Sequence, residues 1–156
     1  MPKTVIPELQ TEVPKPHPVL KCLLGAYDYS IIGEAGGLTR FGIHIEVLRP
    51  GSKSSLRNWY ETEGEMIYML LGEVVLIEKT ETRLCKGDAA YWPAGAATAH
   101  CLENSSDADA SYLTIGTRNR LDTIHYPDHN LITHKDGAAR RYSQSDGSPY
   151  PERTSK

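Results

Sequence analysis

Hydrophobic and polar residues alternate along residues 41–48. One side of the pattern holds Phe41, Ile43, Ile45 and Val47, and the other holds Gly42, His44, Glu46 and Leu48. Successive side chains of a β-strand point to opposite faces, so the alternation predicts a strand with one apolar face and one mixed face. The Arg-Pro-Gly-Ser sequence at 49–52 predicts a turn after it.

Further short strands are predicted between residues 27 and 117. The segment 65–79 reads EMIYMLLGEVVLIEK and predicts two strands broken at Gly72-Glu73. Four more are expected at residues 81–84, 89–92, 100–103 and 110–115, separated by turn-forming sequences. No window long enough for a helix carries a 3.6-residue apolar stripe. The pattern therefore predicts an all-β domain, either a sandwich or a barrel.

The two ends of the chain differ from this central region. Residues 1–19 are an extended arm, because each proline fixes φ and lacks a backbone donor; the prolines are Pro2, Pro7, Pro14, Pro16 and Pro18. Residues 118–156 are polar and rich in turn residues, which predicts an irregular tail that becomes disordered from about Ser143. We therefore divide the chain into an arm at 1–19, a β domain at 20–117 and a tail at 118–156.

Composition narrows the class of protein. A chain of 156 residues is the size of one domain, and its net charge of −3 argues against nucleic acid or an anionic membrane as a partner. Three cysteines at irregular spacing give no disulfide framework. The first 20 residues hold no apolar run long enough for a signal peptide or a membrane span, so the expected location is the cytoplasm.

Two motifs in the region 50–104 resemble those of the cupin superfamily. The first family motif is a glycine, two histidines one residue apart, a glutamate and a second glycine; its frame falls here on Gly51, Asn58, Tyr60, Glu65 and Gly72. The second falls on Gly87, Pro93, Gly95, His100 and Asn104, with a longer spacing between Gly95 and His100 than the family pattern has. Both family histidines of the first motif are replaced.

The resemblance implies a double-stranded β-helix, the cupin or jelly-roll barrel, with a pocket at one end. In such cupins three histidines and one glutamate point into the pocket and bind iron, manganese, nickel or zinc. It also implies that Glu65 and His100 face the pocket, and that Asn58 and Tyr60 stand where the other two ligands would be. Dimers are common among cupins of this shape, so a homodimer is expected.

Asn58 and Tyr60 are poor replacements for histidine ligands. They lie two apart on a strand, so both face the same side. A neutral amide oxygen suits calcium better than a late transition metal, and a phenol binds iron only after losing its proton. We therefore expect no metal cofactor, with a divalent transition metal held by Glu65, His100 and Tyr60 as the alternative.

A metal-free pocket still offers acid–base chemistry. Tyr60, Glu65 and His100 are the expected catalytic residues, since they suit proton transfer next to a carbonyl. Asn58 can hold a substrate oxygen. Further residues are expected to contact the ligand: His44 on the mixed face of its strand, Arg57 beside the pocket strand, and Met69 and Trp92 as pocket wall. Each of these residues could instead have no contact with a ligand: His44 as an exposed histidine, Arg57 as a solvated arginine, and Met69 and Trp92 as part of the core.

Three functions remain open at this stage. The first is a metal-independent enzyme of the isomerase, epimerase or cyclase type acting on a small molecule. The second is a metal-dependent dioxygenase or sugar-type isomerase that uses Glu65, His100 and Tyr60. The third is a non-catalytic dimeric module that binds a ligand, which the proline-rich arm and Trp59 favour, because Trp59 is out of phase with Asn58 and Tyr60 and points away from the pocket.

Overall fold

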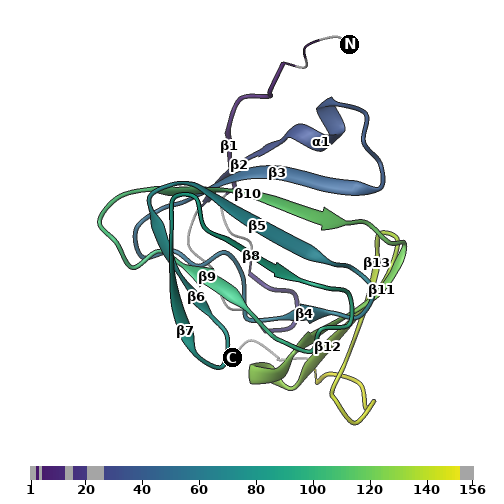
Figure 1. Cartoon of the computed structure of the whole chain (residues 1–156). Helices are drawn as coiled ribbons and strands as arrows, with labels where there is room; N and C mark the ends of the chain where they lie inside the picture. Colours follow the sequence, from purple (N-terminus) through teal and green to yellow (C-terminus); the bar gives the residue numbers. More distant parts are fainter. Residues whose placement is uncertain (1–2, 4, 13–15, 21–26, 152–156) are drawn as a thin grey trace.

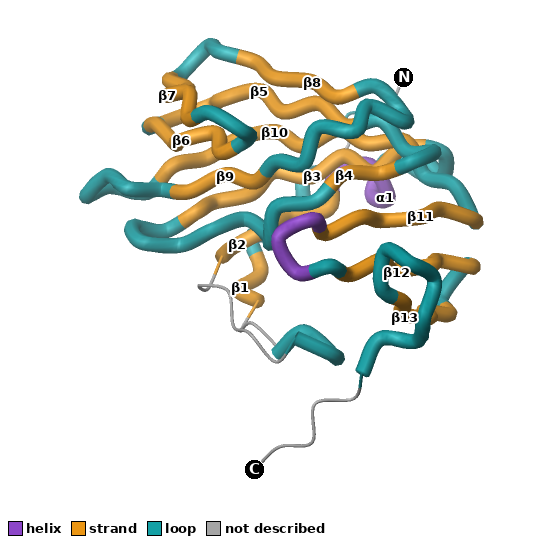
Figure 2. The backbone as a smooth tube through the Cα atoms, turned by 90° about the horizontal axis from the view of Figure 1, so that it is seen from below, coloured by secondary structure: helices purple, strands orange, loops and turns teal. Residues whose placement is uncertain are grey.

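The strands enclose an interior between two walls. The computed structural model describes residues 3, 5–12, 16–20 and 27–151. Figure 1 shows a wall of long strands facing a wall of shorter ones, and Figure 2 shows the same barrel from below. Antiparallel pairing connects all the strand neighbours, which confirms the all-β prediction.

The long wall is one six-stranded sheet. Its strands, in spatial order, are β1 (Gln10–Glu12), β2 (Tyr27–Ile31), β3 (Phe41–Leu48), β10 (Ala110–Thr117), β5 (Glu65–Leu71) and β8 (Ala89–Trp92). The strand predicted at 89–92 has the observed bounds, and β3 covers the alternating segment. Two strands far apart in sequence, β3 and β10, lie side by side at its centre because the chain returns after building the other wall.

The opposite wall consists of two smaller sheets. The first is made of β7 (Glu81–Cys85), β6 (Glu73–Ile77) and β9 (Cys101–Glu103). The second is made of β13 (Ala139–Ser143), β12 (Leu131–Asp136), β11 (Leu121–Tyr126) and β4 (Trp59–Tyr60). The prediction of an irregular tail at 118–156 is therefore wrong over residues 121–143. Pairing of β11 with β4 ties this region to the barrel, so long-range hydrogen bonds override its weak apolar pattern.

Gly72 makes the corner between the two walls. Residues 71 and 73 belong to β5 and β6, which lie in different sheets. The φ of Gly72 is 72°, and a Cβ there would lie 2.7 Å from the carbonyl oxygen of Asp109. Any side chain would collide with the backbone, so only glycine fits the corner. This explains the glycine at the end of the first motif.

The mixed face of β3 points into the barrel and its apolar face points out. The register aligns Ile43 with Ile115 on β10, and Ile115 with Met66 on β5, which is 38% exposed. Tyr91 extends this outward row onto β8 and is 73% exposed. The same register turns His44 inward. The strand reverses the usual arrangement because its inner face lines a polar cavity.

The core lies between the six-stranded sheet and the three-stranded sheet of the opposite wall. Its buried residues come from both walls: Leu48, Ile67, Met69, Val74, Leu76, Leu84, Trp92, Leu102, Ala110 and Tyr112. Ile67, Trp92, Leu102 and Tyr112 lie at its boundary, because they also line the cavity described below.

Asn104, the last residue of the second motif, is a buried structural group. It is fully buried, and its Nδ2 donates to the carbonyl oxygens of Leu48 at 2.7 Å and Ala108 at 2.8 Å. Its Oδ1 accepts from the amide and the hydroxyl of Ser106. The side chain therefore fixes the loop between β9 and β10 to the end of β3.

Replacing Asn104 with alanine is expected to lower the free energy of unfolding by about 2–4 kcal/mol, because it removes the amide hydrogen bonds to the carbonyls of Leu48 and Ala108 and the acceptor of Ser106. Urea unfolding of the variant and the wild type measures this difference. Asn119→Ala is the control, since Asn119 is exposed. Equal losses in the two variants would contradict the role given to Asn104.

The arm of residues 1–19 is described in part. Within it β1 pairs with β2, and the ring of His17 contacts those of Tyr126 and Tyr142 edge-on, at centroid distances of 5.8 and 5.9 Å. The described part of the arm thus packs against both the long wall and the β11–β13 sheet. Pro2 and Pro14 lie outside the described residues, and the domain boundaries at 19 and 117 stay predictions.

Helical structure is short throughout the described residues. It comprises α1 (Ile32–Ala35) and the 3-10 turn η1 (Pro127–His129). No helix in the described part of the chain is long and apolar enough to cross a membrane. The homodimer also stays a prediction. Trp59 is stacked on His125 and gives the dimer little support. The outward row that contains Met66 and Tyr91 is an exposed apolar surface.

Candidate functional site

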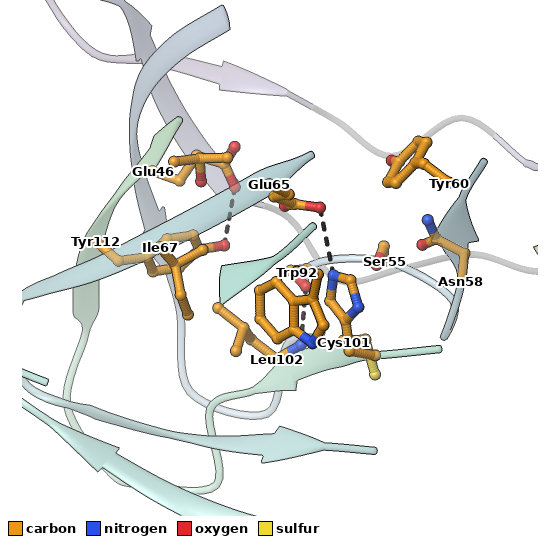
Figure 3. Close-up of a pocket in the computed structure, with 13 residues that line it drawn as sticks. Glu46, Ser55, Asn58, Tyr60, Glu65, Ile67, Trp92, Cys101, Leu102 and Tyr112 are labelled. Carbon is orange, nitrogen blue, oxygen red and sulfur yellow. Dashed lines mark hydrogen bonds and ion pairs between the residues drawn. The ribbon is translucent and has the colours of Figure 1, made fainter. Parts of the chain in front are cut away.

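A cavity of about 230 Å³ opens inside the barrel next to the core. Five of the residues predicted to form the site line it: Asn58, Tyr60, Glu65, Trp92 and His100. Figure 3 shows that Glu65 on β5 and Tyr60 on β4 approach the same space from different strands. The remaining lining residues are Glu46, Ser54, Ser55, Ile67, Cys101, Leu102, Tyr112 and Thr114.

Strand pairing brings these side chains together. Asn58 and His100 form an isolated antiparallel bridge, with backbone hydrogen bonds of 3.2 and 3.0 Å in the two directions. On the other wall Glu65 is paired with Trp92. Residues directly opposite in an antiparallel pair project from the same face, so each pair places two side chains together.

Glu65 and His100 form the central contact of the cavity. Oε2 of Glu65 lies 3.3 Å from Nε2 of His100, and Nδ1 of His100 lies 3.0 Å from the carbonyl oxygen of Thr98. A carbonyl oxygen only accepts, so Nδ1 carries a proton. Nε2 faces the carboxylate, so an imidazole nitrogen and a carboxylate oxygen meet inside the cavity. The pair can therefore accept or release a proton within the cavity.

Trp92 fixes the orientation of His100. The two rings are stacked with centroids 3.5 Å apart and planes 4° apart. The indole Nε1 of Trp92 donates to Oε1 of Glu78 at 2.7 Å, which in turn fixes the indole. The imidazole is therefore held between the indole face and the carbonyl of Thr98, with Nε2 directed at Glu65.

Tyr60 enters the cavity as a neutral phenol. Burial raises the pKa of Tyr60 well above its ordinary value, and the nearby Glu65 raises it further. The side chain of Asn58 is hydrogen-bonded to this phenol. At neutral pH Tyr60 is therefore a proton donor or hydrogen-bond donor.

The donor set does not fit the metal that the family pattern implies. Glu65 and His100 supply two suitable ligands, while the phenol of Tyr60 resists ionisation and Asn58 offers a neutral amide. No group of three or more His, Cys, Asp and Glu side chains placed to hold a metal ion occurs among the described residues. Facial sites for iron and closed sites for zinc require three or four such ligands placed together, and neither Glu46 nor Cys101, which also line the cavity, completes such a group with Glu65 and His100.

Glu46 is a second carboxyl group in the cavity that the sequence analysis did not assign to the site. Its Oε2 accepts a hydrogen bond of 2.8 Å from the hydroxyl of Tyr112. Burial raises the pKa of Glu46, and the charge of Glu65 raises it further, against opposing hydrogen bonds from Tyr112 and Thr114. The available signal was its position two residues from His44, on the same face of β3.

The raised pKa of Glu46 makes stability depend on pH. The folded state holds this proton more tightly than the unfolded state, so stability is lost as pH rises above the ordinary value of 4.5. Glu46→Gln keeps an acceptor for Tyr112 and removes the titration. We expect a higher Tm than wild type at about pH 8 and a similar Tm at about pH 4.

Thermal unfolding at the two pH values checks this. Glu81→Gln, on the exposed part of β7, is the control and should follow wild type at both. A Glu46→Gln variant that is less stable than wild type at the higher pH would refute the role of burial at this carboxyl.

Two residues predicted to contact the ligand do not line the cavity. The guanidinium of Arg57 points outward, where Nε donates to Oδ2 of Asp128 at 2.9 Å and Nη1 to the carbonyl of Glu78 at 2.6 Å. Being adjacent to Asn58 on an extended segment, it faces the opposite side. Met69 is fully buried in the core. It shares the inward face of Glu65 but lies further along β5, where packed side chains fill the interior.

His44 and Trp59 also lie outside the lining of the main cavity. His44 lines an adjoining compartment that shares Tyr60 and Glu65 with the main cavity. Trp59 points away from the cavity, as predicted, and stacks on His125 with centroids 4.0 Å apart.

Comparison with known proteins identifies the family. A family model described as a cupin domain matches residues 44–116. A crystal structure named as a sugar phosphate isomerase from a cupin superfamily, from Silicibacter pomeroyi DSS-3, is 31% identical, covers 92% of each chain and superposes with a TM-score of 0.84. The chain belongs to the cupin superfamily. This confirms the predicted double-stranded β-helix.

Two more distant structures show the same cupin fold. A protein from Acidithiobacillus ferrooxidans ATCC 23270 is 24% identical over 78% of each chain, with a TM-score of 0.75. A polyketide cyclase from Streptomyces resistomycificus is 16% identical, covers 75% of this chain and 79% of its own, and has a TM-score of 0.57. No curated protein matches the chain.

Proposed function

We propose that this cupin is a metal-independent isomerase that moves a proton next to the carbonyl group of a small hydroxylated substrate. The observation that carries the proposal is the pairing of Glu65 with His100 in a cavity that also holds the phenol of Tyr60 and the carboxyl of Glu46. A carboxylate–imidazole pair that faces a second acidic group can supply a base and an acid to one substrate. Membership of the cupin superfamily supports small-molecule binding in the barrel.

The chemistry divides between the two sides of the cavity. The Glu65–His100 pair takes the proton from the carbon beside the carbonyl. Tyr60 or Glu46, whose pKa values are both raised by burial, donates a hydrogen bond or a proton to the carbonyl oxygen. The resulting enediol becomes the isomeric carbonyl compound when the base gives the proton to the former carbonyl carbon and the deprotonated acid takes the proton of the hydroxyl on the other carbon, where the new carbonyl forms. No atom or electron is gained or lost in these reaction steps.

The name of the relative from Silicibacter pomeroyi, a sugar phosphate isomerase, supports isomerisation as the reaction class. The cyclase from Streptomyces resistomycificus supports the fold alone. The donor chemistry of Asn58 and Tyr60 supports independence from metal over the metal-dependent alternative.

Deuterium incorporation tests the proposal. The protein is incubated in D₂O with a panel of aldoses, ketoses and their phosphate esters, and proton NMR follows loss of the signal next to the carbonyl. Exchange that persists after dialysis against EDTA is the expected result. Exchange abolished by EDTA and restored by one metal would establish the metal-dependent reaction instead, and tight binding without exchange would establish a non-catalytic module.

A further inference from the structure

A second compartment of about 140 Å³ adjoins the main cavity, with Tyr60, Glu65 and Thr114 common to both linings. Its floor lacks side chains where two glycines meet. Gly42 on β3 pairs with Gly116 on β10, and Gly116 pairs with Glu65 on β5. These three residues form one inward-facing row, so the space beside Glu65 exists because its neighbours have no Cβ. Glycine within a strand often marks a place where a ligand approaches the backbone.

An arginine lies over this glycine floor. A Cβ on Gly42 would lie 3.2 Å from Nε and 3.6 Å from Nη2 of Arg118, so the guanidinium rests against the bare backbone. Nη1 of Arg118 donates to Oε1 of Glu34 at 2.8 Å, and Nη2 lies 3.5 Å from Nε2 of His44. These contacts use two of the five N–H groups of the guanidinium.

The charges around Arg118 leave the compartment able to accept an anion. Glu63 also lines it, but its Oε1 is engaged by Nζ of Lys135 at 2.5 Å and by the amide of Asn119 at 2.6 Å, which balances its charge. Glu65 is directed at His100 in the main cavity. Glu34 sits outside on α1 with 56% of its side chain exposed, so solvent screens its charge.

We propose that this compartment is a subsite for the anionic oxygen group of the substrate, a phosphate or a carboxylate, bound by Arg118 with His44 beside it. A guanidinium presents donors in a planar fork that matches such groups. One part of this inference, that the other end of the substrate reaches Glu65, rests on the proposed function. It makes the substrate a small anionic carbonyl compound, with its charge in one compartment and its reacting carbons in the other.

Calorimetric titration of the full chain with inorganic phosphate tests the subsite without requiring turnover. Wild type is expected to bind phosphate, and Arg118→Gln to lose about tenfold to a hundredfold in affinity, as for a lost charge-assisted hydrogen bond. Arg120→Gln is the matched control. Arg120 lies two residues along, pairs with Asp136 and has 80% of its side chain exposed, so its loss should leave phosphate affinity unchanged.

A second variant covers the case in which Arg118→Gln does not fold. Gly42→Ala keeps the charge and crowds the guanidinium, because the added Cβ lies 3.2 Å from Nε. Phosphate binding should weaken in this variant too. Absence of phosphate and acetate binding in wild type, or equal affinities in Arg118→Gln and Arg120→Gln, would overturn the subsite.

Parallel titrations with phosphate and acetate distinguish the two sources of the charge. Binding of either that depends on Arg118 supports the subsite, and the tighter of the two identifies the group. Deuterium exchange separates the subsite from the proposed function. If phosphate binding depends on Arg118 but the protein shows no exchange activity, the isomerase is refuted and the subsite stands. If the protein binds no anion and Arg118→Gln does not impair exchange, the subsite is refuted and the isomerase stands.

Discussion

Glu65→Gln is expected to slow deuterium exchange by about 10²–10⁴-fold, the usual contribution of a positioned general base. Glutamine keeps the size and shape of the side chain but replaces one acceptor oxygen by an NH₂ donor and cannot take up the substrate proton. The carboxylate that faces Nε2 of His100 is lost as well. Because the change is isosteric, KM for the substrate should move much less than kcat.

The chain supplies a matched control for this variant. Glu61 lies 2.8 Å from Nε2 of His125, and Trp59 stacks on that imidazole, as Trp92 stacks on His100. Glu61 lines neither compartment. Glu61→Gln therefore breaks a similar glutamate–histidine contact outside the cavity and should keep the wild-type exchange rate. Equal activity in Glu65→Gln and wild type, with both folded, would remove Glu65 from the catalytic site.

Restoring both histidines is expected to create a metal site where the natural side chains offer a poor one. The double variant Asn58→His/Tyr60→His adds two imidazoles next to Glu65 and His100, which completes a set of four ligands from the residues at the family positions. We expect it to bind about one nickel or zinc ion per chain. Wild type should bind the same ions far more weakly, since its amide and phenol are poor donors.

Elemental analysis after dialysis with each metal measures this difference. Adding Glu65→Gln to the double variant is the control, because it removes the carboxylate ligand and should weaken binding. Stoichiometric metal in wild type would contradict our assessment of the donor set. Failure of the double variant to bind metal, with its fold intact, would show that the side chains at 58, 60, 65 and 100 do not converge although all four line the cavity.

The polar cavity of this cupin also explains why its stability and its chemistry are connected. Burial in the cavity raises the pKa of the Glu46 carboxyl, at a cost in stability above its ordinary pKa. Function thus places a group where packing alone would favour an apolar one.

The sequence by itself determined the strands of the central region, because alternation along the backbone has a period of two whatever the strand packs against. It placed the strand at 89–92 and the break at Gly72 correctly, and the motif spacing indicated that Glu65 and His100 meet. It missed the strands at 121–143, where few apolar residues mark the pattern and pairing with β4 supplies the stability.

Only the tertiary structure decided which face of each strand points inward and which groups share a space. Periodicity divides β3 into two faces but does not say that the face with His44 and Glu46 lines the cavity, since that depends on the strands across the barrel. For the same reason, the sequence could not show which of Arg57 and Arg118 lies next to the cavity. Asp128 holds the first outside, whereas Gly42 lets the second lie over the compartment beside Glu65.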